Sequence, residues 1–156
     1  MSLGREIGKR RPFEVLEEEA MLNVVRTADV LQRELVDLFR PFELSQTQYN
    51  VLRILRGALE EAGGGLACGE IARRMITRDP DITRLLDRLE KRGLIARGRD
   101  ENDRRIVLAR ITRAGTKLLA GLDPRVAEAH KKRLGHMSRE DLKQLIALLE
   151  AARRST

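Results

Sequence analysis

Aromatic residues are scarce in this chain: they make up 3% of its 156 residues, and there is no tryptophan. Proteins that bind single-stranded nucleic acids stack bases on aromatic side chains, so the composition argues against that class. The one cysteine, Cys68, excludes an internal disulfide framework and a Cys-rich zinc site. The two histidines, His130 and His136, lack a third ligand at metal-binding spacing, so we expect no metal and no cofactor.

Long apolar runs are missing as well. No stretch approaches the roughly 18 consecutive apolar residues that a membrane-spanning helix needs, and the first residues lack the apolar segment of a secretory signal. Apolar residues still make up 42% of the chain, which is enough for a hydrophobic core. We therefore expect one soluble domain over residues 1–156, located in the cytoplasm and without a membrane partner.

Sequence patterns typical of enzymes are also absent. The chain contains no Ser/His/Asp or Cys/His arrangement for nucleophilic catalysis and no HExxH metal motif. The three glycines at 63–65 do not lead into a Lys-Ser/Thr helix start, so they do not form a phosphate-binding loop. We expect a protein that is not an enzyme.

Charge is abundant and unevenly distributed. The formal net charge is +7, made up of +3 in residues 1–12, −5 in residues 13–68, +4 in residues 69–112 and +5 in residues 113–156. Such a surplus indicates a polyanionic partner such as nucleic acid, or simply a well-solvated basic surface.

The first half of the chain predicts three helices. Apolar residues recur at steps of three and four over residues 14–40, and Pro41 ends this helix. Ser45 and Gln48 form a capping box for the next helix, which should bury residues such as Leu59. A short helix over 68–76, poorly capped at its start, follows the glycines.

The second half predicts a helix, a hairpin and two further helices. Asp79 and Pro80 should start a helix that runs to about Arg92, where Gly93 supplies the left-handed residue after its end. Strands are expected at 94–97 and 106–111, with a polar loop between them. Thr112 then caps a helix that Pro124 should kink or interrupt, and Ser138 opens the last one.

This order of elements predicts a mainly α fold with a small β-hairpin. A short helix, a turn and a second helix with a basic outer face form a helix-turn-helix arrangement, whose second helix enters the DNA major groove. The hairpin that follows would be a wing, with its tip projecting toward phosphates or the minor groove. The winged helix-turn-helix should span about residues 45–111.

The segment that carries these elements resembles the MarR family of bacterial transcription regulators. Its recognition-helix motif, T-R-x-x-D-x-L-x-x-x-G-L-[IV]-x-R, falls on Thr83, Arg84, Asp87, Leu89, Gly93, Leu94, Ile95 and Arg97. The wing motif D-x-R falls on Asp103 and Arg105, and the T-x-x-G after the wing falls on Thr112 and Gly115. The resemblance covers about residues 14–152.

The resemblance implies a homodimeric regulator that binds a pseudo-palindromic operator in double-stranded DNA, most often as a repressor. It also implies dimerisation through the terminal helices, here about residues 14–40 and 113–152, and control by a small-molecule effector. The sequence supports the dimer independently, because these helices carry more leucine and isoleucine than a small core needs.

The same resemblance makes Thr83 and Arg84 contacts to bases or phosphates; the alternative is a solvated helix face. Arg88 could contact the DNA backbone, or pair with Asp87 or Glu90.

In the wing, Arg105 is the candidate for minor-groove insertion, and Arg99 and Arg104 are candidates for phosphate contacts. Asp103 would be repelled by phosphates, so we expect it to pair with a nearby arginine and shape the tip.

Cys68 lies outside the first helix, where peroxide-sensing relatives carry their cysteine, and an incidental small residue is the simpler interpretation. A second class of function also fits, namely a winged-helix module that binds protein or RNA without reading an operator.

Overall fold

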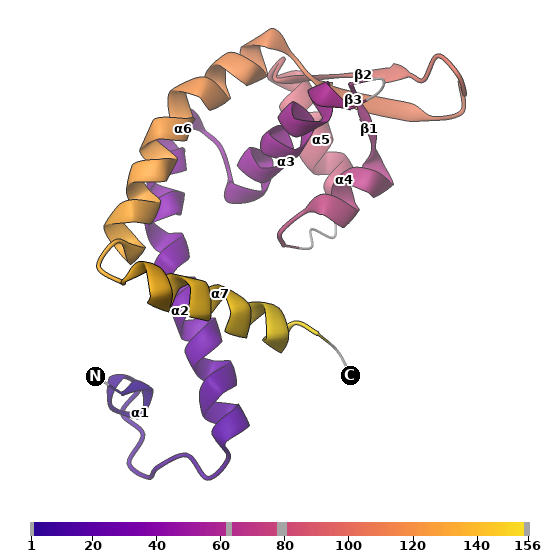
Figure 1. Cartoon of the computed structure of the whole chain (residues 1–156). Coiled ribbons are helices and arrows are strands. Elements are labelled where there is room, and N and C mark those ends of the chain that lie inside the picture. Colours follow the sequence, from indigo (N-terminus) through magenta and orange to yellow (C-terminus); the bar gives the residue numbers. More distant parts are fainter. Residues whose placement is uncertain (1, 62–63, 78–80, 155–156) are drawn as a thin grey trace.

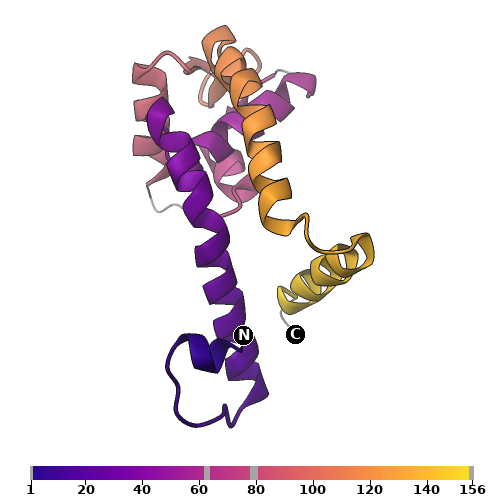
Figure 2. The same ribbon diagram turned by 90° about the vertical axis from the view of Figure 1, so that its left-hand side faces the viewer.

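The computed structural model describes residues 2–61, 64–77 and 81–154 (Figure 1). In chain order the elements are α1 (Leu3–Glu6), α2 (Leu16–Phe39), η1 (Arg40–Phe42), α3 (Gln46–Gly57), η2 (Ala58–Glu60), β1 (Leu66–Ala67), α4 (Cys68–Arg74), α5 (Ile82–Lys91), β2 (Ile95–Arg99), β3 (Val107–Ile111), α6 (Arg113–Leu134) and α7 (Arg139–Ala152). Helices α3 to α5 and the sheet form a lobe, and α2, α6 and α7 form an elongated part beside it (Figures 1 and 2). The fold is mainly α with a small antiparallel sheet, as the sequence predicts.

The junction between α2 and α3 is stabilised by a helix cap that the sequence predicts and by a contact between two aromatic rings. Ser45 accepts a hydrogen bond from the Gln48 backbone N–H, and the Gln48 side chain accepts one from the Ser45 N–H, so the expected capping box is present. Phe39 at the end of α2 is fully buried and stacks on Tyr49 with ring centroids 4.5 Å apart. The expectation for Leu59 was wrong: α3 ends at Gly57, and Leu59 lies 50% exposed in the tighter turn that follows.

The sheet has three strands, in the order β1-β3-β2, where the sequence predicted a two-stranded hairpin. The additional strand is only two residues long, and Leu66 pairs with Ala109 of β3. A strand this short carries no alternation of apolar and polar residues, which is why the sequence did not reveal it. It connects the start of α4 to the wing.

Recognition-helix candidate α5 begins at Ile82, and the Asp81 carboxylate caps it by accepting from the Arg84 backbone N–H. The expected start at Asp79 and Pro80 lies outside the described residues. At its other end Gly93 has a φ of +68°, the left-handed conformation expected after a helix.

Helix α6 runs without a break from Arg113 to Leu134, so of the two outcomes expected at Pro124, a kink or an interruption, the interruption does not occur. Leu122 and Val126, on either side of the proline, are buried in the core, and this packing holds the helix together where the proline removes one backbone hydrogen bond. Asp123 also ties this region to α3, through two hydrogen bonds from the Arg56 guanidinium at 2.6 and 3.1 Å.

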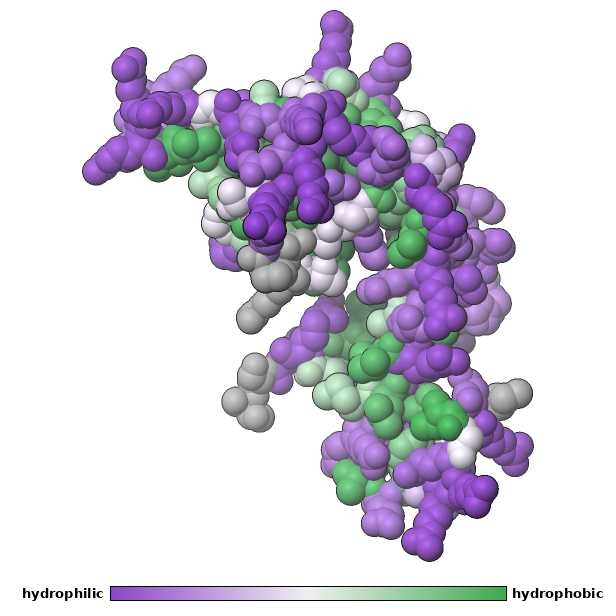
Figure 3. All heavy atoms as spheres, turned by 180° about the vertical axis from the view of Figure 1, so that it is seen from behind, coloured by the Kyte–Doolittle hydropathy of each residue, from purple (hydrophilic) through white to green (hydrophobic). Residues whose placement is uncertain are grey.

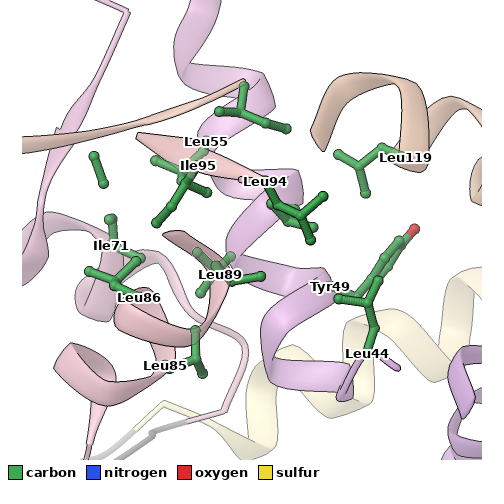
Figure 4. Close-up of a cluster of buried hydrophobic side chains, with 14 of the residues drawn as sticks. Leu44, Tyr49, Leu55, Ile71, Leu85, Leu86, Leu89, Leu94, Ile95 and Leu119 are labelled. Atoms are coloured by element: carbon green, nitrogen blue, oxygen red, sulfur yellow. The ribbon is translucent and has the colours of Figure 1, made fainter. Parts of the chain in front are cut away.

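One hydrophobic core spans both parts of the molecule. In the lobe it contains residues such as Leu55, Ile71, Leu89 and Ile95, which converge from α3, α4, α5 and β2 (Figure 4). Phe39 of α2 and three residues of α6 complete it, namely Leu119, Leu122 and Val126. The core therefore fixes the lobe to the two long helices.

Candidate nucleic-acid interface

Helix α5 presents one apolar and one polar face. Leu85, Leu86 and Leu89 are buried, whereas Thr83, Arg84 and Arg88 are exposed on the opposite face. The burial of the leucines fixes the rotation of the helix, so that the three candidate contact residues face solvent together.

Arg84 forms an ion pair at the N-terminal end of the exposed face of α5. Its Nε atom lies 3.1 Å from the Asp81 carboxylate, and 77% of its side chain is exposed. The pair orients the guanidinium without burying it. Asp81 thus caps the helix and holds Arg84, and its negative charge stands next to the surface that DNA would approach.

Neither acidic residue proposed as an alternative partner for Arg88 binds it. Asp87 and Glu90 both pair with Arg97 of β2, each at 2.6 Å. Hydrogen bonds from Arg97 lower the pKa of Glu90 below its ordinary value, so this link between α5 and the wing stays charged. The family arginine at 97 is therefore a structural residue.

The wing tip is organised by two aspartates. Asp100 accepts hydrogen bonds from the backbone N–H groups of Asn102 and Asp103, at 2.7 and 2.9 Å. Asp103 accepts from the backbone and the guanidinium of Arg105, and these bonds lower the Asp103 pKa. Asp103 thus pairs with an arginine and orders the turn, the arrangement that the sequence suggested.

The three wing arginines remain exposed around that turn. Arg105 is 90% exposed although it is paired, and Arg99 donates to the backbone carbonyl of Arg104 at 3.2 Å. The hairpin projects from the lobe in Figure 1, and Figure 3 shows hydrophilic side chains extending from its end. Exposed arginines at the end of a projecting hairpin suit contacts to phosphates.

Two hydroxyl groups that the sequence did not single out as site residues lie near the arginines of α5. Ser45 Oγ and Thr47 Oγ1 are 2.8 Å apart, and with Arg84 and Arg88 they line a small hollow of about 130 Å³. The capping motif marks Ser45, but nothing in the sequence shows that α3 begins beside the exposed face of α5.

A larger hollow of about 380 Å³ lies between α2 and α6. Its apolar lining comes from Leu31, Leu35, Ala129 and Leu134. Its polar lining comes from Gln32, Glu34, His130 and Arg133. Glu34 pairs with Lys132 and Arg133 at 3.2 and 2.5 Å, which lowers its pKa. The aromatic-poor sequence gave no indication of this hollow.

Within the described ranges, no three His, Cys, Asp or Glu residues are placed to hold a metal ion. Cys68 is half-buried and packs against the core at the start of α4. Among these same residues, no helix is both long and apolar enough to cross a bilayer.

Comparison with known proteins gives one family. The model of the MarR family matches residues 44–107. A MarR transcription factor of Planctomyces limnophilus is 43% identical over 90% of this chain and 99% of its own, with a TM-score of 0.66. The regulator PcaV of Streptomyces coelicolor, solved with its natural ligand, is 26% identical over 81% of this chain and 88% of its own, with a TM-score of 0.66.

The fold extends to more distant structures. AbsC, a MarR family transcriptional regulator of Streptomyces coelicolor, shares 22% identity over 91% of this chain and 95% of its own, with a TM-score of 0.78. The winged lobe, the exposed basic face of α5 and the arginine-tipped hairpin agree with these similarities. The chain belongs to the MarR family and is a DNA-binding transcriptional regulator.

Proposed function

We propose that this regulator is a homodimeric repressor that binds a pseudo-palindromic operator and blocks transcription by occupying it. The observation that carries the proposal is the combination of an exposed basic face on α5 with a large apolar surface on α2 and α7. The first suits DNA, and the second suits a second copy of the chain, so that two recognition helices would face successive major grooves about 10 base pairs apart.

The apolar surface is extensive. Exposed apolar residues on α2 include Leu16, Met21, Val24, Val25 and Val36, between 44% and 77% exposed. Helix α7 buries none of its residues, and its Ile146 and Leu148 are 56% and 61% exposed. Figure 3 shows hydrophobic side chains gathered on the elongated part of the molecule. An apolar surface of this kind is covered in stable proteins, and a two-fold partner covers both helices at once.

Each subunit would read one half-site. We assign Thr83 and Arg84 to base edges or phosphates, since an arginine can bind guanine with two hydrogen bonds, and Arg88 to the backbone. In the wing we assign Arg105 to the minor groove and Arg99 and Arg104 to phosphates. Asp103 would hold Arg105 for this contact.

The organisation of the chain follows from these roles. The winged helix-turn-helix of about residues 45–111 would carry the DNA contacts. The helices over about 14–40 and 113–152 would form the dimer, all within one domain of residues 1–156. A repressor of this kind acts on the chromosome, so its place is the cytoplasm, on the nucleoid when bound.

A small-molecule effector would bind in the hollow between α2 and α6. Four apolar residues and a few polar groups suit a small molecule with an apolar body and one polar end. Because α2 and α6 join the lobe to the dimer surface, a ligand there could change the distance between the two lobes. The complex of PcaV with its natural ligand supports this role by similarity.

Selection of genomic fragments by the purified protein tests the proposal. We expect one or a few fragments with inverted half-sites to be enriched above competitor DNA, and a dimer in sedimentation velocity. Arg84→Ala should weaken binding more on the operator than on unrelated DNA. Arg10→Ala is the control for loss of a positive charge, because Arg10 is also exposed but lies outside the winged lobe and the helices assigned to the dimer.

Three outcomes would contradict parts of this proposal. No enrichment above non-specific binding would favour the module that binds protein or RNA. A monomer at micromolar concentration would remove the two-fold arrangement. An equal loss for Arg84→Ala on every DNA would show that Arg84 does not read sequence.

A further inference from the structure

Arg92 joins the end of α5 to the turn between α2 and α3. The residue follows the last residue of α5, and its guanidinium donates two hydrogen bonds, to the Glu43 carbonyl at 2.7 Å and to the Phe42 carbonyl at 2.8 Å. These two carbonyls belong to residues 49 and 50 positions earlier in the chain. The planar fork of an arginine reaches two adjacent carbonyl oxygens at once, which the single ammonium of a lysine does not reproduce.

The turn that Arg92 binds, residues 40–43, is held in place by a backbone hydrogen bond and by the buried residue before it. Glu43 adopts the left-handed conformation with a φ of +51°, and its N–H donates to the Arg40 carbonyl at 3.0 Å. Phe39, directly before the turn, is fully buried. Arg92 therefore ties α5 to backbone that the core holds in place.

Helix α6 contacts the same turn from another direction. The Arg125 guanidinium lies over the Phe42 ring, 5.3 Å from its centroid. Two residues earlier, Asp123 receives the Arg56 guanidinium from α3. The turn of residues 40–43 thus lies between the helix that would read DNA, through Arg92, and the helices that would form the dimer, through α2 and Arg125.

From this arrangement we infer that Arg92 sets the angle between α5 and the dimer helices, and so determines which spacing between half-sites the dimer accepts. This inference rests on the proposed function. It makes Arg92 a positioning residue that need not touch DNA. Without the two hydrogen bonds, α5 would keep its leucines buried but lose its polar connection to the turn, and a wider range of orientations would bind.

The test compares operators that differ only in spacing. Inserting or deleting one base pair at the centre rotates one half-site by about 35° relative to the other, given roughly 10 base pairs per turn. We expect the wild-type dimer to bind the natural spacing much more tightly. In Arg92→Lys, which keeps the charge but loses the fork, the ratio of affinities between natural and altered spacing should fall by about fivefold or more, the lower end of couplings between separate sites.

Two further variants make the result specific. Arg92→Gln, shorter and uncharged, should show the same loss of spacing preference, whatever its overall affinity. Lys91→Met, the control, removes an exposed charge from the adjacent residue and should leave the preference unchanged. Thermal unfolding of each variant confirms that the fold is intact.

The outcomes separate this inference from the function on which it rests. If the wild-type protein selects no operator, the proposed function fails and the inference fails with it. If it selects an operator but binds all spacings equally, or if Arg92→Lys weakens every spacing by the same factor, the inference alone is overturned.

Discussion

Gly115, in the first turn of α6, lies where no side chain fits. An added Cβ would be 2.7 Å from Ile111 Cγ1 and would overlap the Leu94 carbonyl oxygen. That oxygen accepts a hydrogen bond from the Thr112 N–H at 3.0 Å, so it cannot move without loosening the start of the helix. Gly115→Ala should therefore push α6 away from the base of the wing.

The size of the effect follows from two opposing contributions. Alanine stabilises a helix interior by about 0.5–1 kcal/mol relative to glycine. Forcing extra atoms into a packed site costs about 1–3 kcal/mol. The upper end of this range applies here because the added Cβ would overlap a backbone oxygen, that of Leu94. The net destabilisation should therefore be about 2–2.5 kcal/mol, which lowers the melting temperature of a chain of this size by roughly 4–10 °C.

Thermal unfolding, followed by circular dichroism or calorimetry, measures this change, and Gly121→Ala is the matched control. Gly121 lies in the same helix, is exposed, and has nothing within 4 Å of its added Cβ. That variant should be stabilised by about 0.5–1 kcal/mol. If Gly115→Ala were stabilised to the same extent, the close packing between α6 and the base of the wing would be refuted.

Ion pairs and exposed apolar residues give three further predictions. Arg56 lowers the Asp123 pKa, so their pair stabilises the fold above the unfolded pKa of about 3.9 and is lost as the pH falls through the lower folded value. In unfolding titrations the wild-type advantage over Asp123→Asn should therefore shrink below about pH 4, and a constant difference would contradict the pair. Arg105→Ala should reduce affinity for every DNA and make the salt dependence shallower, by about 0.9 for each phosphate that the variant no longer neutralises; an unchanged slope removes this residue from the interface. Replacing Ile146 and Leu148 of α7 with glutamate should give monomers in sedimentation velocity and weaken operator binding, and a persisting dimer would place the interface elsewhere.

Local signals in the sequence predicted most of the fold. The capping residues Ser45 and Ser138 and the left-handed Gly93 mark helix ends, because each satisfies backbone groups within a few residues. The ordered motifs from Thr83 to Gly115 indicated the family, since they fix the spacing of helix, turn and wing at once. These features depend only on neighbours in the chain.

The features that the sequence did not predict depend on contacts between residues far apart in the chain. Pro124 was expected to kink or interrupt α6, and the helix continues through it because the long-range burial of Leu122 and Val126 outweighs the local preference of proline. Strand β1 exists because β3 is beside it.

In the candidate site, the sequence identified the arginines and the pairing of Asp103 with an arginine of the wing, but not the partners of the other arginines. The pairing of Arg84 with Asp81 was not anticipated, and the bonds from Arg92 to a turn almost fifty residues earlier could not be anticipated. Interactions across such separations depend on the assembled fold.

The shared core has a consequence for attempts to build hybrid regulators. Because Phe39, Leu119 and Leu122 complete the interior of the winged lobe, a cut at residues 45 and 111 would open that interior to water on the side facing α6. Transplanting the lobe onto the dimer helices of a relative would therefore require the donor and acceptor interiors to match at these three positions, and a graft that also carries residues 39–44 and 112–126 should tolerate the exchange far better.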